Sequence, residues 1–205
     1  MAEANRKKRH HRGRRRKRKG GVLSNLILAV AVVVFCVSGF QLIRIGKGYL
    51  DGRSEYEKVR DVALTNPDEQ EGFRVDFEEL MKINPDTVGW IRFYPEPSQI
   101  NYPIVQGQDN DEYLHRTFSA NENTLGAIFL NVDNKADFSD RNSILYGHRM
   151  KDGSMFRHLQ DYEEKSFWEE NPYFYIYTPD GREITYQIYS YAVVESTSDI
   201  YLTSF

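Results

Sequence analysis

One uninterrupted apolar segment constrains this sequence more than any other feature. Residues 22–43 (VLSNLILAVAVVVFCVSGFQLI) contain no Asp, Glu, Lys or Arg. Coiled as an α-helix at about 1.5 Å per residue, such a segment reaches roughly 33 Å, which is enough to cross the hydrocarbon core of a bilayer. We therefore predict a membrane-spanning helix near the N-terminus.

The residues before this segment are strongly basic. Residues 1–21 hold 11 Lys or Arg and one acidic residue, Glu3. A basic block beside a span stays on the cytoplasmic side, where it meets anionic lipid, so the rest of the chain is expected outside the cell. We predict a basic tail over 1–21, a signal-anchor helix over 22–45, a helical stalk and linker over 46–72, and a folded domain over 73–205. A cleaved signal peptide, with Ser38 and Gly39 near its end, is the alternative.

The charge balance reverses after the tail. Residues 22–205 keep 16 of the 27 basic and 29 of the 30 acidic side chains. An acidic body disfavours nucleic acid as a partner. The one cysteine, Cys36, lies in the apolar segment. It has no partner for an intrachain disulfide, and nothing in lipid would stabilise its thiolate.

The rest of the sequence alternates short β-rich runs with turn signals. Strands are predicted over 88–93, 100–106, 126–132, 142–148, 173–178 and 182–195, the last two joined by Pro179-Asp180-Gly181. Helices are predicted over 77–83 with Asp76 as cap, over 109–118, and over 154–170 with Ser154 as cap. This pattern favours a β-barrel or sandwich with accessory helices.

One histidine stands out as a candidate for chemistry. In NSILYGHRMKDGSMF (142–156), an apolar strand ends in Gly147-His148. The strand would fix the base of the imidazole, the glycine permits a close approach, and the following loop leaves the ring accessible. The sequence has no HExxH pattern, no Cys/His ligand spacing, no glycine-rich phosphate loop and no Gly-x-Ser-x-Gly elbow. No metal or cofactor is therefore predicted.

Four segments together resemble the class B sortases, the membrane-anchored cysteine transpeptidases of Gram-positive bacteria. They are FEELMKINPDTVGWIRF (77–93), INYPIVQGQDNDEYL (100–114), GAIFLN (126–131) and NSILYGHRMKDGSMF (142–156). The resemblance implies an eight-stranded β-barrel preceded by N-terminal helices, with residues 73–205 as the catalytic domain. It also implies that His148 is the catalytic acid/base.

The resemblance further implies a reaction and its partners. Such an enzyme cleaves the C-terminal sorting signal of a secreted protein through a thioester and transfers the acyl group to an amine of a peptidoglycan precursor or a pilin. The family's nucleophile is the cysteine of a Thr-Leu-x-Thr-Cys motif, and an arginine follows on the next strand. Residues 197–205 match neither motif. We therefore expect a C-terminally truncated sortase that lacks its last barrel strands and is inactive as given.

The resemblance also places residues along a substrate groove. Thr197, Tyr201 and Leu202 resemble the start of the helix-bearing loop that contacts the sorting signal. Asn131 stands where many relatives have Asp. The full set of implied substrate-binding residues is Asn110, Leu114, Tyr146, Thr197, Tyr201 and Leu202.

Two other functions fit the same residues. One is a non-catalytic, membrane-anchored extracellular protein that binds a peptide along the groove without turning it over. The other is a metal-dependent extracellular hydrolase that uses His148. Binding without turnover would favour the first, and a protein without metal would exclude the second.

Overall fold

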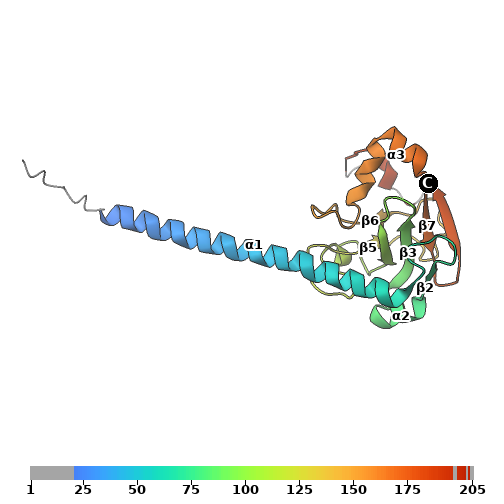
Figure 1. The fold of residues 1–205 in the computed structure, drawn as a ribbon, viewed down its shortest axis with the longest axis horizontal. Helices are drawn as coiled ribbons and strands as arrows, with labels where there is room; N and C mark the ends of the chain where they lie inside the picture. Colours follow the sequence, from blue (N-terminus) through green and yellow to red (C-terminus); the bar gives the residue numbers. More distant parts are fainter. Residues whose placement is uncertain (1–20, 196–197, 202, 204–205) are drawn as a thin grey trace, which may run out of the picture. The chain divides into compact units, whose positions relative to one another are not determined.

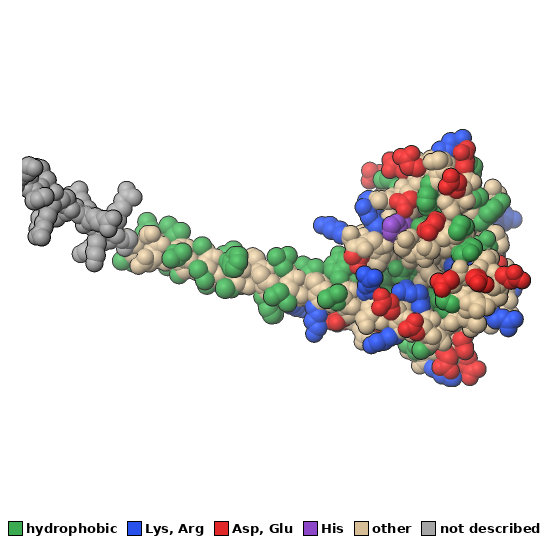
Figure 2. All heavy atoms as spheres, viewed as in Figure 1, with side chains coloured by type: hydrophobic (Ala, Val, Ile, Leu, Met, Phe, Trp, Pro, Cys, Tyr) green, Lys and Arg blue, Asp and Glu red, His purple; other side chains and the backbone are tan. Residues whose placement is uncertain are grey.

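The computed structural model describes residues 21–195, 198–201 and 203, and the chain divides into two compact units, Met1–Ile43 and Arg44–Phe205. The described part of the first unit is the apolar portion of helix α1 (Val22–Ala63; Figure 1). The hydrophobic side chains of this portion are exposed (Figure 2). Within the described ranges, α1 is the one helix long and apolar enough to cross a membrane. A membrane anchor and a signal sequence both satisfy this description.

The second unit is built on a six-stranded sheet with the strand order β6-β5-β4-β3-β7-β8 (Figure 1). Neighbouring strands are antiparallel except β4 and β5, which are parallel. A separate ladder pairs β1 (Leu64–Thr65) with β2 (Arg74–Val75). The strands of the larger sheet are β3 (Thr87–Phe93), β4 (Asn101–Val105), β5 (Ile128–Leu130), β6 (Leu145–Tyr146), β7 (Tyr173–Tyr177) and β8 (Glu183–Gln187).

The parallel pair requires a long connection because no tight turn can join two parallel strands. Residues 106–127 form this connection, which we call the crossover, and it contains the short 3-10 helix η1 (Glu112–Leu114). Asn110 and Leu114 both lie on the crossover. The parallel pairing thus determines where two of the predicted groove residues sit.

The core forms around β3, which lies between β4 and β7. Trp90 and Ile91 are buried there. In the second unit, helix α1 buries Gly52, Tyr56, Val59 and Ala63, which recur every three or four residues and so share one face of the helix. Gly52 allows close packing, because a Cβ atom there would lie 2.9 Å from Cδ2 of Leu125.

The structure confirms some predicted local features. Helix α2 (Phe77–Ile83) is capped by Asp76, whose Oδ1 accepts a hydrogen bond from the Glu79 amide at 3.0 Å. The turn between β7 and β8 also forms, with Gly181 at φ 86° and its amide 2.9 Å from the Thr178 carbonyl oxygen.

The predicted helices over 109–118 and 154–170 are wrong in extent. Over 109–118 the structure has only η1. Over 154–170 it has two pieces, the 3-10 helix η2 (Arg157–Glu163) and helix α3 (Lys165–Glu170). Ser154 caps neither, because Met155 has φ 55° and cannot begin a right-handed helix. Glu164 separates the pieces since its backbone is extended, with φ −88° and ψ 116°.

Candidate active site

His148 lies two residues beyond the end of β6, as the strand-end pattern predicts. Gly147 allows this placement, because a Cβ atom there would overlap Ile128 and lie 2.7 Å from Cδ2 of Phe156. On the other side, the His148 carbonyl oxygen accepts a hydrogen bond from the Phe156 amide at 2.9 Å. The backbone of His148 is therefore held on both sides.

The imidazole of His148 is half-buried, and its Nε2 atom lies 2.7 Å from the carbonyl oxygen of Leu114. A carbonyl oxygen can only accept a hydrogen bond, so Nε2 must carry the proton in this contact. Nδ1 is then the ring nitrogen that can take up and release a proton. The contact thus assigns the two nitrogens different roles, one orienting and one reactive.

Gly126, at the end of the crossover, permits this contact. Its φ is 62°, in the left-handed region that favours glycine. A Cβ atom at Gly126 would lie 2.9 Å from the Leu114 carbonyl oxygen and 3.0 Å from Cδ2 of His148. Any larger residue would therefore press on both partners of the hydrogen bond.

Hydrogen bonds to the buried side chain of Tyr113 hold η1, the 3-10 helix that contains this residue. Its hydroxyl donates to Oδ2 of Asp86 at 2.7 Å and accepts from Nδ2 of Asn84 at 2.9 Å. Burial raises the pKa of Tyr113, so the phenol stays neutral and keeps donating. This network places the Leu114 backbone, which follows directly.

Two other predicted groove residues meet at the segment after β5. Oδ1 of Asn110 accepts a hydrogen bond from the Val132 amide at 2.9 Å. The hydroxyl of Tyr146 accepts from Nδ2 of Asn131 at 3.0 Å, and its ring lies 5.1 Å from the Phe129 ring. Asn110 and Tyr146 are therefore linked through the adjacent residues Asn131 and Val132.

The remaining predicted groove residues lie near the C-terminal end. Tyr201 belongs to the 3-10 helix η3 (Asp199–Tyr201), and the structure connects this helix to the segment before β6. The Ile200 carbonyl oxygen accepts from Nδ2 of Asn142 at 3.1 Å. Thr197 and Leu202 lie outside the described residues.

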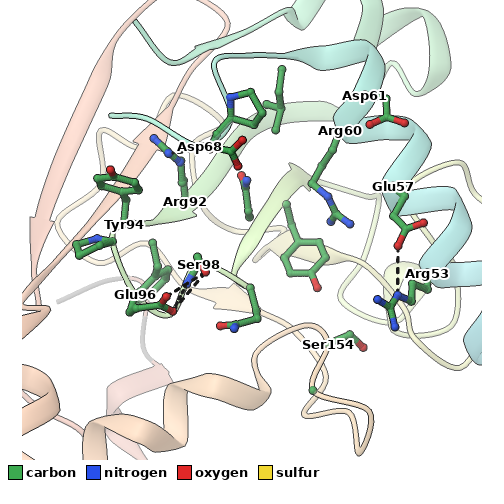
Figure 3. A pocket seen from close by; sticks show the side chains of 18 of the residues that line it. Arg53, Glu57, Arg60, Asp61, Asp68, Arg92, Tyr94, Glu96, Ser98 and Ser154 are labelled. Atoms are coloured by element: carbon green, nitrogen blue, oxygen red, sulfur yellow. Dashed lines mark hydrogen bonds and ion pairs between the residues drawn. The ribbon is translucent and has the colours of Figure 1, made fainter. Parts of the chain in front are cut away.

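A cavity of about 880 Å³ lies elsewhere, between the C-terminal part of α1 and the loops that follow β1 and β3 (Figure 3). Of the predicted site residues that the structure describes, none lines this cavity. Some of its charged side chains have partners within the cavity wall: Arg53 pairs with Glu57 at 3.2 Å, and Glu96 accepts a hydrogen bond from the Ser98 amide at 2.9 Å. We therefore locate the candidate active site at His148 and not in this cavity.

The described residues hold no group of three or more His, Cys, Asp or Glu side chains that could bind a metal ion. Cys36, which is exposed on the apolar portion of α1, belongs to the first unit. The site thus contains a histidine whose backbone and ring are both held in place.

Comparisons with known proteins identify the family. A family model described as "Sortase domain" matches residues 95–204. Sortase B of Listeria monocytogenes is 38% identical over 151 residues, covering 74% of this chain and 58% of that protein. Sortase B of Staphylococcus aureus is 32% identical over 168 residues, covering 82% of this chain and 67% of that protein. The chain therefore belongs to the sortase B family.

Solved structures agree with the sequence matches. The crystal structure of sortase B from B. anthracis in complex with AAEK1 has a TM-score of 0.61 and 33% identity, and the match covers 76% of each chain. The Staphylococcus aureus sortase B–substrate complex has a TM-score of 0.59 and 27% identity, with 82% of this chain and 72% of that chain covered. The predicted fold class is confirmed: the six strands form a curled half-barrel of the sortase type, with a long apolar N-terminal helix.

Sequence reasoning missed three residues that shape the site. Gly126 was placed inside a strand, although a glycine at the start of an apolar run is also a turn signal. Asn131 was given no role, yet it orients Tyr146. Tyr56 falls within the predicted helical stalk over 46–72, and nothing in its local sequence indicates that its hydroxyl reaches the crossover.

Proposed function

We propose that this chain acts as a class B sortase, in which His148 is the general acid/base of a cysteine transpeptidation. Membership of the sortase B family supports the reaction class. The observation that carries the role of His148 is its hydrogen bond to the Leu114 carbonyl oxygen at 2.7 Å, which leaves Nδ1 for proton transfer.

The reaction would proceed in two steps through a thioester. A cysteine thiolate attacks the scissile carbonyl carbon of the sorting signal, the C–N bond breaks, and the protonated Nδ1 of His148 gives its proton to the leaving amine. An acceptor amine, from a peptidoglycan precursor or a pilin, then attacks the thioester. His148 takes up the proton of that amine, the new amide forms, and the thiolate is regenerated. The family's arginine would donate hydrogen bonds to the substrate or to the oxyanion.

The nucleophile and the arginine are not assigned to residues of this sequence. Its one cysteine, Cys36, lies in the apolar segment, and no Thr-Leu-x-Thr-Cys motif is present. We therefore propose that these 205 residues do not catalyse transpeptidation by themselves, and that activity requires a segment carrying both groups. Reading the nucleotides after codon 205 in all three frames would identify such a segment if the gene encodes one.

Substrate contacts are proposed for the residues around His148. Asn110, Leu114 and Tyr146 would line the groove, and η3 with Tyr201 would form its wall. A substrate-binding role is likewise proposed for Thr197 and Leu202, which lie outside the described residues. The proposed partners are secreted proteins that carry a sorting signal.

A turnover assay tests this function. The full chain, with and without the restored C-terminal segment, is incubated with a sorting-signal peptide and an amine acceptor. We expect product only from the extended chain, and a loss of about 10²- to 10⁴-fold in the extended chain with His148→Ala. A thioester on the 205-residue chain would contradict the proposed inactivity, and turnover without His148 would contradict its role.

Peptide binding without catalysis is the second candidate, and the absence of the nucleophile motif from the sequence favours it. Titrating a labelled sorting-signal peptide into the full chain separates the two. Binding by the 205 residues, together with no turnover after extension, would support the binding protein. Turnover after extension would support the enzyme.

We further propose that α1 anchors the chain in the cell membrane as a single span, with the basic tail in the cytoplasm and the second unit outside. The 22-residue uncharged segment and the basic residues before it support this topology. Protease added to intact cells should degrade the second unit and leave the tail protected. Release of the second unit from the membrane without protease would instead indicate a cleaved signal sequence.

A further inference from the structure

Helix α1 contacts the crossover through two consecutive side chains. The carboxylate of Glu55 accepts hydrogen bonds from Oγ1 of Thr117 at 2.9 Å and from the Ser119 amide at 2.9 Å. The next residue, Tyr56, is 2% exposed, and its hydroxyl reaches deeper. It donates to the Gly126 carbonyl oxygen at 2.9 Å and accepts from the Phe118 amide at 3.2 Å.

The Gly126–Ala127 peptide unit is therefore held at both of its polar groups. Its carbonyl oxygen accepts from Tyr56, and its N–H, which belongs to Ala127, donates to the Tyr113 carbonyl oxygen at 2.9 Å. This peptide unit lies directly against the site. A Cβ atom added to Gly126 would be 2.9 Å from the Leu114 carbonyl oxygen and 3.0 Å from Cδ2 of His148.

We propose that Tyr56 is a positioning residue for His148. Its hydroxyl holds the Gly126–Ala127 peptide, and this peptide keeps the Leu114 carbonyl oxygen in place to accept the Nε2 proton of the imidazole. The inference rests on the proposed acid/base role of His148. If it is correct, a residue of α1, the helix that also contains the apolar segment, influences catalysis.

The chemistry of Tyr56 suits this role. Burial raises its pKa well above the ordinary value for tyrosine, so the hydroxyl keeps its proton and remains a donor. Its ring packs edge-on against Tyr102 with centroids 5.3 Å apart, which fixes the direction of the hydroxyl. Phenylalanine would keep this packing and remove both hydrogen bonds, leaving a buried carbonyl and a buried amide without their partner.

The substitution Tyr56→Phe tests the proposal, and Tyr162→Phe is the matched control. Tyr162 is also buried, and its hydroxyl donates to a backbone carbonyl oxygen, that of Asn171, at 3.0 Å. That bond joins η2 to the end of α3 and does not involve the crossover. Both variants lose one buried tyrosine hydroxyl, so a change at His148 caused by losing a buried hydroxyl anywhere in the second unit would appear in both.

The readout is the tautomer of His148, which requires no turnover. The full chain is labelled with ¹⁵N-histidine in detergent micelles, and the two ring nitrogens of His148 are identified by comparison with His148→Gln. We expect the Nε2-protonated tautomer in the unsubstituted chain and in Tyr162→Phe, and a shift toward the Nδ1-protonated tautomer in Tyr56→Phe. Identical His148 signals in the unsubstituted chain and Tyr56→Phe, or equal shifts in both variants, would overturn the proposal.

A kinetic measurement adds a second readout in the extended chain. Tyr56→Phe should lower kcat about tenfold, part of the roughly 10²- to 10⁴-fold contribution of a positioned acid/base, with KM unchanged. A change in KM alone would contradict positioning. Absence of turnover in every extended chain would count against the proposed function, while the His148 signals would still decide the role of Tyr56.

Discussion

Nε2 of His148 lies 2.7 Å from the carbonyl oxygen of Leu114, so a backbone group orients the imidazole where many enzymes use a carboxylate. A side-chain substitution at Leu114 leaves this acceptor in place. The orientation of His148 therefore depends on the path of the crossover backbone. Residues that set this path should matter more than the identity of residue 114.

Gly126→Ala should disturb this orientation. The added Cβ atom meets the Leu114 carbonyl oxygen at 2.9 Å and the His148 ring at 3.0 Å, and alanine is strained at φ 62°. We expect a loss of about 2–4 kcal/mol in the free energy of unfolding, measured by urea denaturation of the full chain in detergent.

Gly181→Ala is the control for Gly126→Ala. Gly181 has φ 86°, but no atom of the described residues beyond its two chain neighbours lies within 4 Å of the position of an added Cβ. This variant therefore suffers the backbone strain alone, about 1–2 kcal/mol. Equal losses in the two variants would show that the close approach at Gly126 contributes nothing.

Arg92→Met should be among the most destabilising substitutions on the central strand. The Arg92 guanidinium is buried between the rings of Phe73 and Tyr94, with Cζ 4.0 Å and 4.5 Å from the two centroids. It donates to Oε1 of Gln70 and to the carbonyl oxygens of Pro67 and Glu69, at 2.9 Å, 3.0 Å and 3.1 Å respectively. Methionine leaves all three acceptors without this donor, at a cost of about 3–5 kcal/mol.

Two further variants serve as controls for Arg92→Met. Arg92→Lys keeps the charge but cannot reproduce the planar fork, so it should recover only part of the loss. Arg74→Met removes an exposed arginine from β2 and should change the unfolding free energy by less than about 0.5 kcal/mol. If Arg92→Met were as stable as Arg74→Met, the buried network would carry no net stability.

The contacts of Arg92 show where sequence reasoning ends. The strand over 88–93 that bears it and the linker that ends at residue 72 are both predicted, but the sequence does not indicate which linker groups meet the arginine. In the structure these groups are two backbone carbonyl oxygens and the side-chain amide of Gln70. Backbone acceptors have no signature in the sequence, because every residue supplies one.

The same reason limits the prediction of the candidate site. The strand-end glycine and family motifs were enough to single out His148. Its orienting partner is a backbone oxygen, brought there by a parallel strand pairing that short-range patterns do not encode. The left-handed backbone conformation of Met155 could not be predicted either, because an apolar residue after Ser154 gives no indication of a positive φ.

Acid should weaken the segment before β6 through Asp140. Its Oδ2 accepts from the Lys135 amide at 2.7 Å and from Nδ2 of Asn134 at 3.1 Å, and these bonds hold the pKa of Asp140 below its ordinary value of 3.8. A depressed pKa in the folded state means that the contribution to stability is complete above pH 3.8 and is lost as pH falls through the folded value.

Comparison with Asp140→Asn isolates this contribution. At pH 7 the variant should be less stable than the unsubstituted chain, and the difference should shrink as pH falls below 3.8 because protonated Asp140 resembles asparagine. Urea unfolding midpoints of both chains across this range provide the measurement. A difference that does not depend on pH would exclude the carboxylate as its source.

Substitutions of Asn131 should show how much its side-chain amide supports Tyr146. Asn131 is 5% exposed, its Nδ2 donates to the Tyr146 hydroxyl at 3.0 Å, and its Oδ1 accepts from the Asp133 amide at 2.9 Å. In Asn131→Asp the Tyr146 hydroxyl can reverse its role and donate to the carboxylate, so we expect the free energy of unfolding to fall by no more than about 1 kcal/mol at pH 7.

Asn131→Leu offers neither a donor nor an acceptor and leaves the Asp133 amide unpaired, so we expect a loss of about 2–4 kcal/mol. Urea unfolding of the two variants should therefore rank leucine well below aspartate, and the reverse order would show that burial of charge outweighs the hydrogen bonds.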